Sequence, residues 1–383
     1  MGFFNFEPLT LPPETETLRR DVRAFLDETL ADMRPVDRAF NWSGRDREFS
    51  RKLGAKGWIG MTWPKKYGGQ ERSFLDRYVL MEELLAAGAP VAAHWISDRQ
   101  SGPMIIAVGT DEQREFFLPK IISGDMSFCI GMSEPDSGSD LAATRSKAEK
   151  VDGGWKLNGT KVWTSGAHEA DYMIGLFRND SDPASKHEGL TQFLIDMKSE
   201  GLTVRPIINL AGLHHFNECV FEDVFIPDER VIGKVGNGWQ QVTSELAFER
   251  SGPERYLSCI QLIIEMLHMA QKRDDPALTE ELGRLTAHVM TLRRMSLAVT
   301  GKLQRGENPA LEASVVKDVG GVFEQALPEI AQRLFEDEPT LQGESSDFQQ
   351  VLAFLMQEAP SFSLRGGTRE ILRGIIARGL GLR

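Results

Sequence analysis

The sequence predicts an α+β protein whose chain runs from helices through a small β domain and back to helices. Two observations predict it: apolar residues follow helical spacing at both ends, and short alternating segments separated by turn residues fill the middle. A length of 383 residues exceeds one ordinary core, so two or three domains are expected. We place them at residues 1–125, 126–236 and 237–383.

The first domain is predicted from three helical stretches. Apolar residues between Glu14 and Met33 recur at helical spacing, and "FLDRYVLMEELLAAG" and "TDEQREFFLPKII" do the same. The intervening "GWIGMTWPKKYGG" carries glycines and a proline and is typical of a loop. This part of the chain should therefore be mostly helical.

The middle domain is predicted from turns between short strands. Asp152-Gly153 and Asn158-Gly159 are pairs that favour tight hairpin turns. The segments "DYMIGLF", "LTQFLIDM" and "ECVFEDVFI" continue as short strands.

After "GKVGNGW" the helical spacing returns, which predicts a helical bundle for the last domain. In "SVVKDVGGVFEQALPEI" the expected apolar face consists of Val315, Val316, Val319, Val322, Phe323, Ala326 and Ile330.

Charge and composition exclude several function classes. A formal net charge of −12 with scattered basic residues disfavours nucleic acid and anionic membranes as partners. The apolar run at the amino terminus is too short for a signal peptide, and no run reaches membrane-spanning length. The three cysteines are odd in number and lack metal-type spacing, so we expect a cytoplasmic protein.

Familiar catalytic motifs are missing from the sequence. It contains no G-x-G-x-x-G after a strand, no Walker loop, no G-x-S-x-G elbow and no H-E-x-x-H. The adjacent pair His214-His215 cannot easily direct both rings to one metal, so a surface or pocket-lining role is favoured and no metal site is expected. A nicotinamide fold and a zinc hydrolase are therefore disfavoured.

Glu249 stands out because it interrupts an apolar stripe. Steps of three and four residues along the expected helix give Trp239, Val242, Leu246, Glu249, Pro253, Tyr256 and Ile260. One interpretation is an ion pair with Arg250 or another arginine. The other is a carboxylate facing an apolar cavity, where desolvation raises its pKa and suits it to act as a general base.

Two further segments could line a planar heterocycle. "FCIGMSEPDSGSDL" and "NGTKVWTSG" offer small hydroxyl residues and an aromatic side chain: Trp163 could cover a face while Ser133 and Ser165 bond to an edge. The alternatives are a core tryptophan and an ordinary polar turn.

Five motifs together resemble the acyl-CoA dehydrogenase family of flavoproteins. "GTDEQREFFLPKIISGD", "MSEPDSGSDL", "LNGTKVWTS", "FEDVFIP" and "GTREILRGIIAR" occur in that family's order and spacing over nearly the whole chain. The resemblance implies an N-terminal α-helical domain, a middle β domain and a C-terminal four-helix bundle. It also implies FAD-dependent α,β-desaturation of an acyl-CoA thioester, in which a glutamate takes the α-proton and the β-hydrogen leaves as hydride to the flavin.

The resemblance assigns ligand roles by position. Met132, Ser133, Trp163 and Ser165 should contact the flavin ring, Gly138 should line it, and Ser139 should lie near the pantetheine arm of the substrate. Near the carboxyl terminus, Thr368 and Glu370 match the family's contacts to FAD.

The base is where this sequence departs from the common pattern. Many members carry the catalytic glutamate directly before the Gly-Thr of the last motif, but here that position is Gly366. A glycine cannot take a proton, although its backbone N–H can help to polarise the thioester carbonyl, as the resemblance implies. Members that resemble isovaleryl-CoA dehydrogenase place the glutamate on the first bundle helix, before an arginine. "AFERSG" matches that pattern, with Glu249 as the base and Arg250 in support.

Two motifs that hold the adenine end of FAD across a subunit contact are altered. Of the family's R-x-x-F segment Arg273 remains, but Pro276 replaces the aromatic residue, and "LQGESSDFQQVLAF" lacks the usual double glycine. A related subunit could supply them, as in heteromeric members that degrade steroid side chains. We therefore expect a homotetramer or an α2β2 heterotetramer, a branched or bulky acyl group, and electron-transfer flavoprotein as acceptor. The alternatives are a non-catalytic, flavin-poor subunit and a flavin oxidase or monooxygenase on the same fold.

Overall fold

The computed structural model describes residues 4–180, 185–249, 252–342 and 345–382, without the side chains of residues 244–249. The chain forms two compact units. Unit 1 comprises Met1–Gly44, Arg72–Val91 and Glu249–Arg383, and unit 2 comprises Arg45–Glu71 and Ala92–Phe248. The three domain ranges predicted from the sequence remain a prediction.

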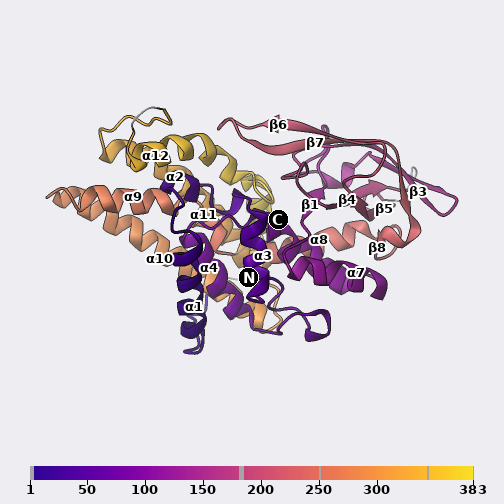
Figure 1. Cartoon of the computed structure of the whole chain (residues 1–383), viewed down its shortest axis with the longest axis horizontal. Coiled ribbons are helices and arrows are strands. Elements are labelled where there is room, and N and C mark those ends of the chain that lie inside the picture. The colour runs from indigo at the N-terminus through magenta and orange to yellow at the C-terminus, as the bar shows by residue number, and fades with distance from the viewer. Residues whose placement is uncertain (1–3, 181–184, 250–251, 343–344, 383) are drawn as a thin grey trace. The chain divides into compact units, whose positions relative to one another are not determined.

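Unit 2 is built on one eight-stranded sheet. Its strands are β1 (Phe128–Gly131), β2 (Lys147–Val151), β3 (Gly154–Lys161), β4 (Tyr172–Arg178), β5 (Leu190–Asp196), β6 (Leu202–Ile208), β7 (His214–Pro227) and β8 (Val231–Ile232). The order is β6-β7-β3-β2-β4-β5-β8, with β1 parallel to β4 at the side of this path. The antiparallel pair β6 and β7 can be followed in Figure 1.

One of the two predicted hairpin turns is present and the other is wrong. Asp152 and Gly153 join β2 to β3, so Val151 pairs with Gly154. Asn158 and Gly159 lie inside β3 instead, at a shift in its register with β7. A Cβ at Gly159 would lie 2.3 Å from the Ser146 hydroxyl, so glycine serves close packing and a bulge there.

The helices of unit 2 precede and follow the sheet. They are α3 (Arg47–Ala55), α5 (Ala92–Ile96), α6 (Gly102–Val108), α7 (Asp111–Ile122) and α8 (Gly238–Glu249). The predicted helix in "TDEQREFFLPKII" is α7, which begins with a capping box between Thr110 and Gln113. The Gln113 amide also donates to the carbonyl oxygens of Glu229 and Val231, which ties α7 to the sheet.

Unit 1 is helical. It contains α1 (Thr15–Thr29), α2 (Pro35–Arg38), α4 (Phe74–Ala86), α9 (Ile260–Ala270), α10 (Pro276–Gln304), α11 (Ala310–Leu334), α12 (Asp347–Glu358) and α13 (Arg369–Gly379). Helix α1 confirms the first predicted helix but ends four residues before Met33.

The apolar face predicted for α11 is partly wrong. Val316 and Phe323 are buried, but Val319 and Val322 are 46% and 43% exposed. The buried side of the helix instead includes Lys317 and Glu324, seven residues apart and therefore on one face. Charged side chains on a buried face are not visible to a count of apolar residues, because their partners come from distant segments.

Candidate functional site

The two segments predicted to contact the flavin ring meet at the end of β1. Met132 and Ser133 follow this strand, and the Val162 N–H, just after β3, donates to the Ser133 carbonyl at 2.9 Å. The Lys161 ammonium donates to the Met132 carbonyl at 3.3 Å. Residues almost thirty positions apart therefore lie side by side in unit 2.

A buried ion pair supports this junction. The Lys161 ammonium lies 2.7 Å from the Glu134 carboxylate, and neither side chain is more than 6% exposed. Backbone N–H groups of Arg145 and Ser146 donate to the same carboxylate at 2.7 and 2.9 Å. Burial lowers the pKa of Lys161 to about 8, against the opposing effect of Glu134. Burial acts to raise the pKa of Glu134, but Lys161 and the N–H donors outweigh it and lower that pKa.

Trp163 and Ser165 lie on a loop that is tied to β7. The Thr164 N–H donates to the Asn217 carbonyl at 3.0 Å, and the Gly166 N–H donates to the His215 carbonyl at 2.9 Å. Trp163 has a φ of +59°, which is rare for a large side chain, and it is 59% exposed. A large exposed ring on a firmly held backbone is suited to contact with another flat ring.

Gly138 and Ser139 lie on an exposed turn after Glu134. A Cβ at Gly138 would meet no atom within 4 Å, so the turn leaves open space beside the backbone. These two residues share a segment with Met132 and Ser133.

The histidines form a cluster that the sequence did not reveal. The rings of His168 and His214 stack with centroids 3.7 Å apart, and the Asn217 side chain bonds to both rings. The Asn217 amide nitrogen also donates to the Thr164 carbonyl. Desolvation lowers the pKa of the mostly buried His215 to about 4. Among the described residues, no group of three His, Cys, Asp or Glu side chains could hold a metal ion.

The glycine segment before α13 is found in unit 1. Gly366 and Gly367 have φ values of +58° and +94°, in the left-handed region that favours glycine. The buried Lys317 ammonium donates to their carbonyl oxygens at 2.5 and 2.6 Å. Because a trans peptide directs its N–H away from its C=O, the N–H groups of Gly367 and Thr368 point away from Lys317.

Thr368 is the residue before the first turn of α13, and Glu370 is exposed in that turn. Backbone hydrogen bonding and the Thr368 hydroxyl lower the pKa of Glu370. Arg273 is engaged within unit 1, with its guanidinium over the Phe335 ring and 3.8 Å from Asp337. Glu370 and Arg273, two of the residues expected to contact FAD in this unit, are therefore both polar and accessible.

Glu249, the candidate base, is the last residue of helix α8. Its side chain lies outside the described residues, as does all of Arg250. The apolar stripe drawn through Glu249 does not follow one helix. Pro253–Arg255 is a separate turn of 3-10 helix, and α9 begins only at Ile260. Gly252 and Pro253 account for the break, since neither favours a continuous helix.

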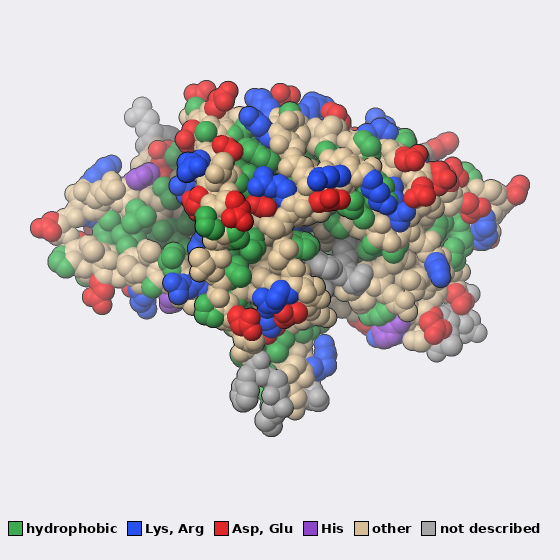
Figure 2. Space-filling view, turned by 90° about the horizontal axis from the view of Figure 1, so that it is seen from below, with side chains coloured by type: hydrophobic (Ala, Val, Ile, Leu, Met, Phe, Trp, Pro, Cys, Tyr) green, Lys and Arg blue, Asp and Glu red, His purple; other side chains and the backbone are tan. Residues whose placement is uncertain are grey.

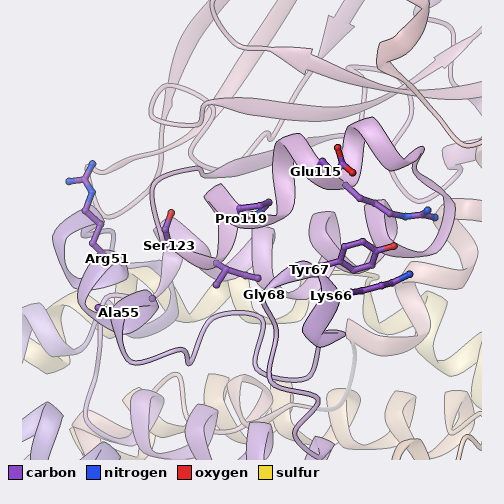
Figure 3. A pocket seen from close by; sticks show the side chains of 11 residues that line it. Arg51, Ala55, Lys66, Tyr67, Gly68, Glu115, Pro119 and Ser123 are labelled. Atoms are coloured by element: carbon purple, nitrogen blue, oxygen red, sulfur yellow. The ribbon is translucent and has the colours of Figure 1, made fainter.

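Two pockets formed by described residues contain none of the predicted site residues. Figure 3 shows one in unit 2, of about 630 Å³, with Arg51, Lys66, Tyr67 and Glu115 around it. A second, of about 850 Å³, lies in unit 1 between the amino-terminal segment and α10. The face in Figure 2 carries interspersed acidic and basic side chains, as the scattered charges of the sequence predict. Within the described residues, no helix is both long enough and apolar enough to span a membrane.

A mostly antiparallel β domain between helical segments, with polar and aromatic residues gathered after β1 and β3, defines the class of acyl-CoA dehydrogenases. Models of this family, described as acyl-CoA dehydrogenase N-terminal, middle and C-terminal domains, match residues 12–125, 129–224 and 236–381. The chain is 31% identical over 389 residues to acyl-CoA dehydrogenase IpdE1 of Mycobacterium tuberculosis, covering 96% of this chain and 98% of that protein. The chain belongs to the acyl-CoA dehydrogenase family of oxidoreductases, which confirms the predicted fold class and enzyme class.

Solved structures agree with this assignment. The Tcur3481-Tcur3483 steroid ACAD matches with a TM-score of 0.87 and 27% identity, covering 99% of each chain. The ChsE4-ChsE5 complex of Mycobacterium tuberculosis matches with a TM-score of 0.86 and 29% identity, covering 98% of this chain and 100% of that one.

Proposed function

We propose that this protein catalyses FAD-dependent α,β-dehydrogenation of an acyl-CoA thioester with Glu249 as the base. The observation that carries the proposal is at Gly366, the position before Gly-Thr where many relatives carry the glutamate. Gly366 has no side chain, and its φ of +58° disfavours one. A carboxylate must come from another segment, and Glu249 closes the helix that begins the matched C-terminal domain.

The residues present are compatible with FAD. The exposed Trp163 ring and the neighbouring Ser133 and Ser165 offer a flat surface and hydrogen-bonding edges, while Thr368 and Glu370 offer polar contacts at the start of α13. Met132 and Gly138 would complete the contacts in unit 2, and Arg273 those in unit 1. When bound, FAD supplies the acceptor for the β-hydrogen.

The protein's own residues have distinct tasks in this proposal. The Glu249 carboxylate accepts the proton from the α-carbon, and Arg250 supports it electrostatically. The Gly366 N–H donates to the thioester oxygen as negative charge develops there. Ser139 contacts the pantetheine arm of the substrate.

Replacing Glu249 by Gln tests the base. We expect the dehydrogenation rate with an artificial electron acceptor to fall at least about 100-fold, because general-base catalysis contributes that much or more. Glu280→Gln is the control, since this exposed carboxylate of α10 should be dispensable. A wild-type rate in Glu249→Gln refutes the assignment. Oxygen consumption with a hydroxylated product in the wild type would instead favour a monooxygenase.

The substrate and assembly are proposed from the relatives. Structures of a steroid ACAD and of a ChsE4-ChsE5 complex suggest a steroid side-chain thioester and a related second subunit. The missing double glycine near residues 341–354 agrees with a shared FAD site. Native mass spectrometry of the purified chain tests the assembly, and a homotetramer with one FAD per chain would contradict the heteromer. Reduction of electron-transfer flavoprotein by the loaded enzyme tests the acceptor.

A further inference from the structure

A buried carboxylate on α11 connects two segments that are far apart in the sequence. Glu324 is fully buried. One of its oxygens accepts the Ser258 N–H at 2.7 Å, and the other accepts from the Arg365 guanidinium at 2.6 Å. Ser258 lies nine residues after Glu249, and Arg365 directly precedes Gly366. All of these residues belong to unit 1.

Arg365 bonds to Ser258 as well as to Glu324, so the three residues contact one another pairwise. Its second terminal nitrogen donates to the Ser258 hydroxyl at 2.8 Å, so the two segments also contact each other directly. The guanidinium plane lies over the Phe362 and Trp42 rings, with distances of 4.3 and 4.9 Å to their centroids. A planar fork with two acceptors and two ring contacts has little freedom to turn.

The same face of α11 holds both segments at further points. Two turns earlier, Lys317 binds the carbonyl oxygens of Gly366 and Gly367. Between Lys317 and Glu324, Gly320 lets the chain at Arg255 approach so closely that a Cβ would lie 2.0 Å from the Arg255 carbonyl. The face therefore fixes the backbone at Arg255 and Ser258 and the backbone at the glycine pair against one rigid helix.

We infer that Glu324 and Arg365 are positioning residues, which align the segment that follows Glu249 with the peptide at Gly366. The inference rests on the proposed function, because it gives these two segments their catalytic roles. It explains how a base can be supplied by a distant helix: the proton acceptor and the N–H that polarises the carbonyl must keep a fixed separation. A purely structural ion pair would stabilise the unit without affecting that separation.

Kinetics of Glu324→Gln test the inference. The amide keeps an oxygen for the Ser258 N–H but directs N–H groups at Arg365, so the Gly366 side of the bridge is lost. We expect kcat to fall about 10- to 100-fold with little change in KM, since a displacement of about 1 Å can cost 100-fold. Glu312→Gln is the matched control, because Glu312 is also a buried carboxylate of α11 but bonds to Lys302 at 2.5 Å and to the Asn5 N–H.

Equal kcat values in Glu324→Gln and Glu312→Gln would overturn the inference. If Glu324→Gln does not fold, Ser258→Ala replaces it, since this variant removes only the hydroxyl that accepts from Arg365 and donates to the Glu254 carbonyl. Its expected effect is a several-fold lower kcat, and an unchanged kcat would count against the inference.

A second measurement does not depend on catalysis. Ser258→Ala should accelerate hydrogen exchange at the amide of Leu364, the residue before Arg365. This amide donates to the Ser361 carbonyl and is more than a hundred residues from Ser258 in sequence. Unchanged exchange there overturns the coupling of the segments even if Glu249 is the base. Conversely, faster exchange together with a fully active Glu249→Gln would retain the coupling and reject the proposed base.

Discussion

Lys161→Met should destabilise the sheet around the candidate flavin contacts by about 3 kcal/mol. Removing one partner of a buried ion pair typically costs about 3–5 kcal/mol, because the other charge stays buried and unpaired. Two N–H groups, of Arg145 and Ser146, still bind the Glu134 carboxylate in the variant, so the lower end of this range applies. The loss of the bond to the Met132 carbonyl should also loosen the end of β1.

Hydrogen exchange of the β2 and β3 amides measures this cost as a local opening free energy. Glu134→Gln combined with Lys161→Met should be less destabilising than Lys161→Met alone, since no unpaired charge remains. Lys150→Met is the matched control: its ion pair with Asp228 in the same unit is about half exposed, and its loss should cost at most about 1 kcal/mol. If Lys161→Met costs no more than Lys150→Met, the reasoning about the buried pair is wrong.

Three further predictions concern other parts of the chain. Burial lowers the pKa of His94 to about 4, below its unfolded value near 6.5. The free energy of unfolding should therefore fall by up to about 3 kcal/mol as the pH drops from 6.5 to 4, and it should fall less steeply in His94→Gln. Asn217→Ala should lower the opening free energy of the loop at Trp163 by about 1–3 kcal/mol, because the buried Thr164 carbonyl loses the bond from the Asn217 amide. Unchanged exchange at the Thr164 amide would contradict this. Gly366→Glu should restore some dehydrogenation activity to Glu249→Gln if both positions face one α-carbon. If a folded, FAD-loaded double variant stays inactive, the shared site is unsupported.

The local signals in the sequence predicted most of the fold. The helical spacing in α7, the turn at Asp152-Gly153 and the order of helices and strands all depend on neighbours in the chain. Asn158-Gly159 misled because the same dipeptide fits a turn and a bulge. Only the close approach of Ser146 to Gly159 decides between them, and these two residues are thirteen positions apart.

The candidate site was less accessible to such reasoning. Met132, Ser133, Trp163 and Ser165 could be selected from motifs, and their roles stay predictions. The sequence gives no signal for Glu324, because a glutamate next to apolar residues on a helix is ordinary. Its partners, Ser258 and Arg365, are 66 and 41 residues distant, and no periodic pattern connects them.

The conformation of Gly366 also limits how such an enzyme can change during evolution. A single substitution that introduces glutamate there would place a side chain in the left-handed region, at a cost of about 1–2 kcal/mol, on a peptide held by Lys317. A base moved back to this loop would therefore work at reduced stability until the backbone changed to relieve that strain. If Glu249 supplies the carboxylate, the acyl pocket can change in size around Gly366 without a change in the glycine itself.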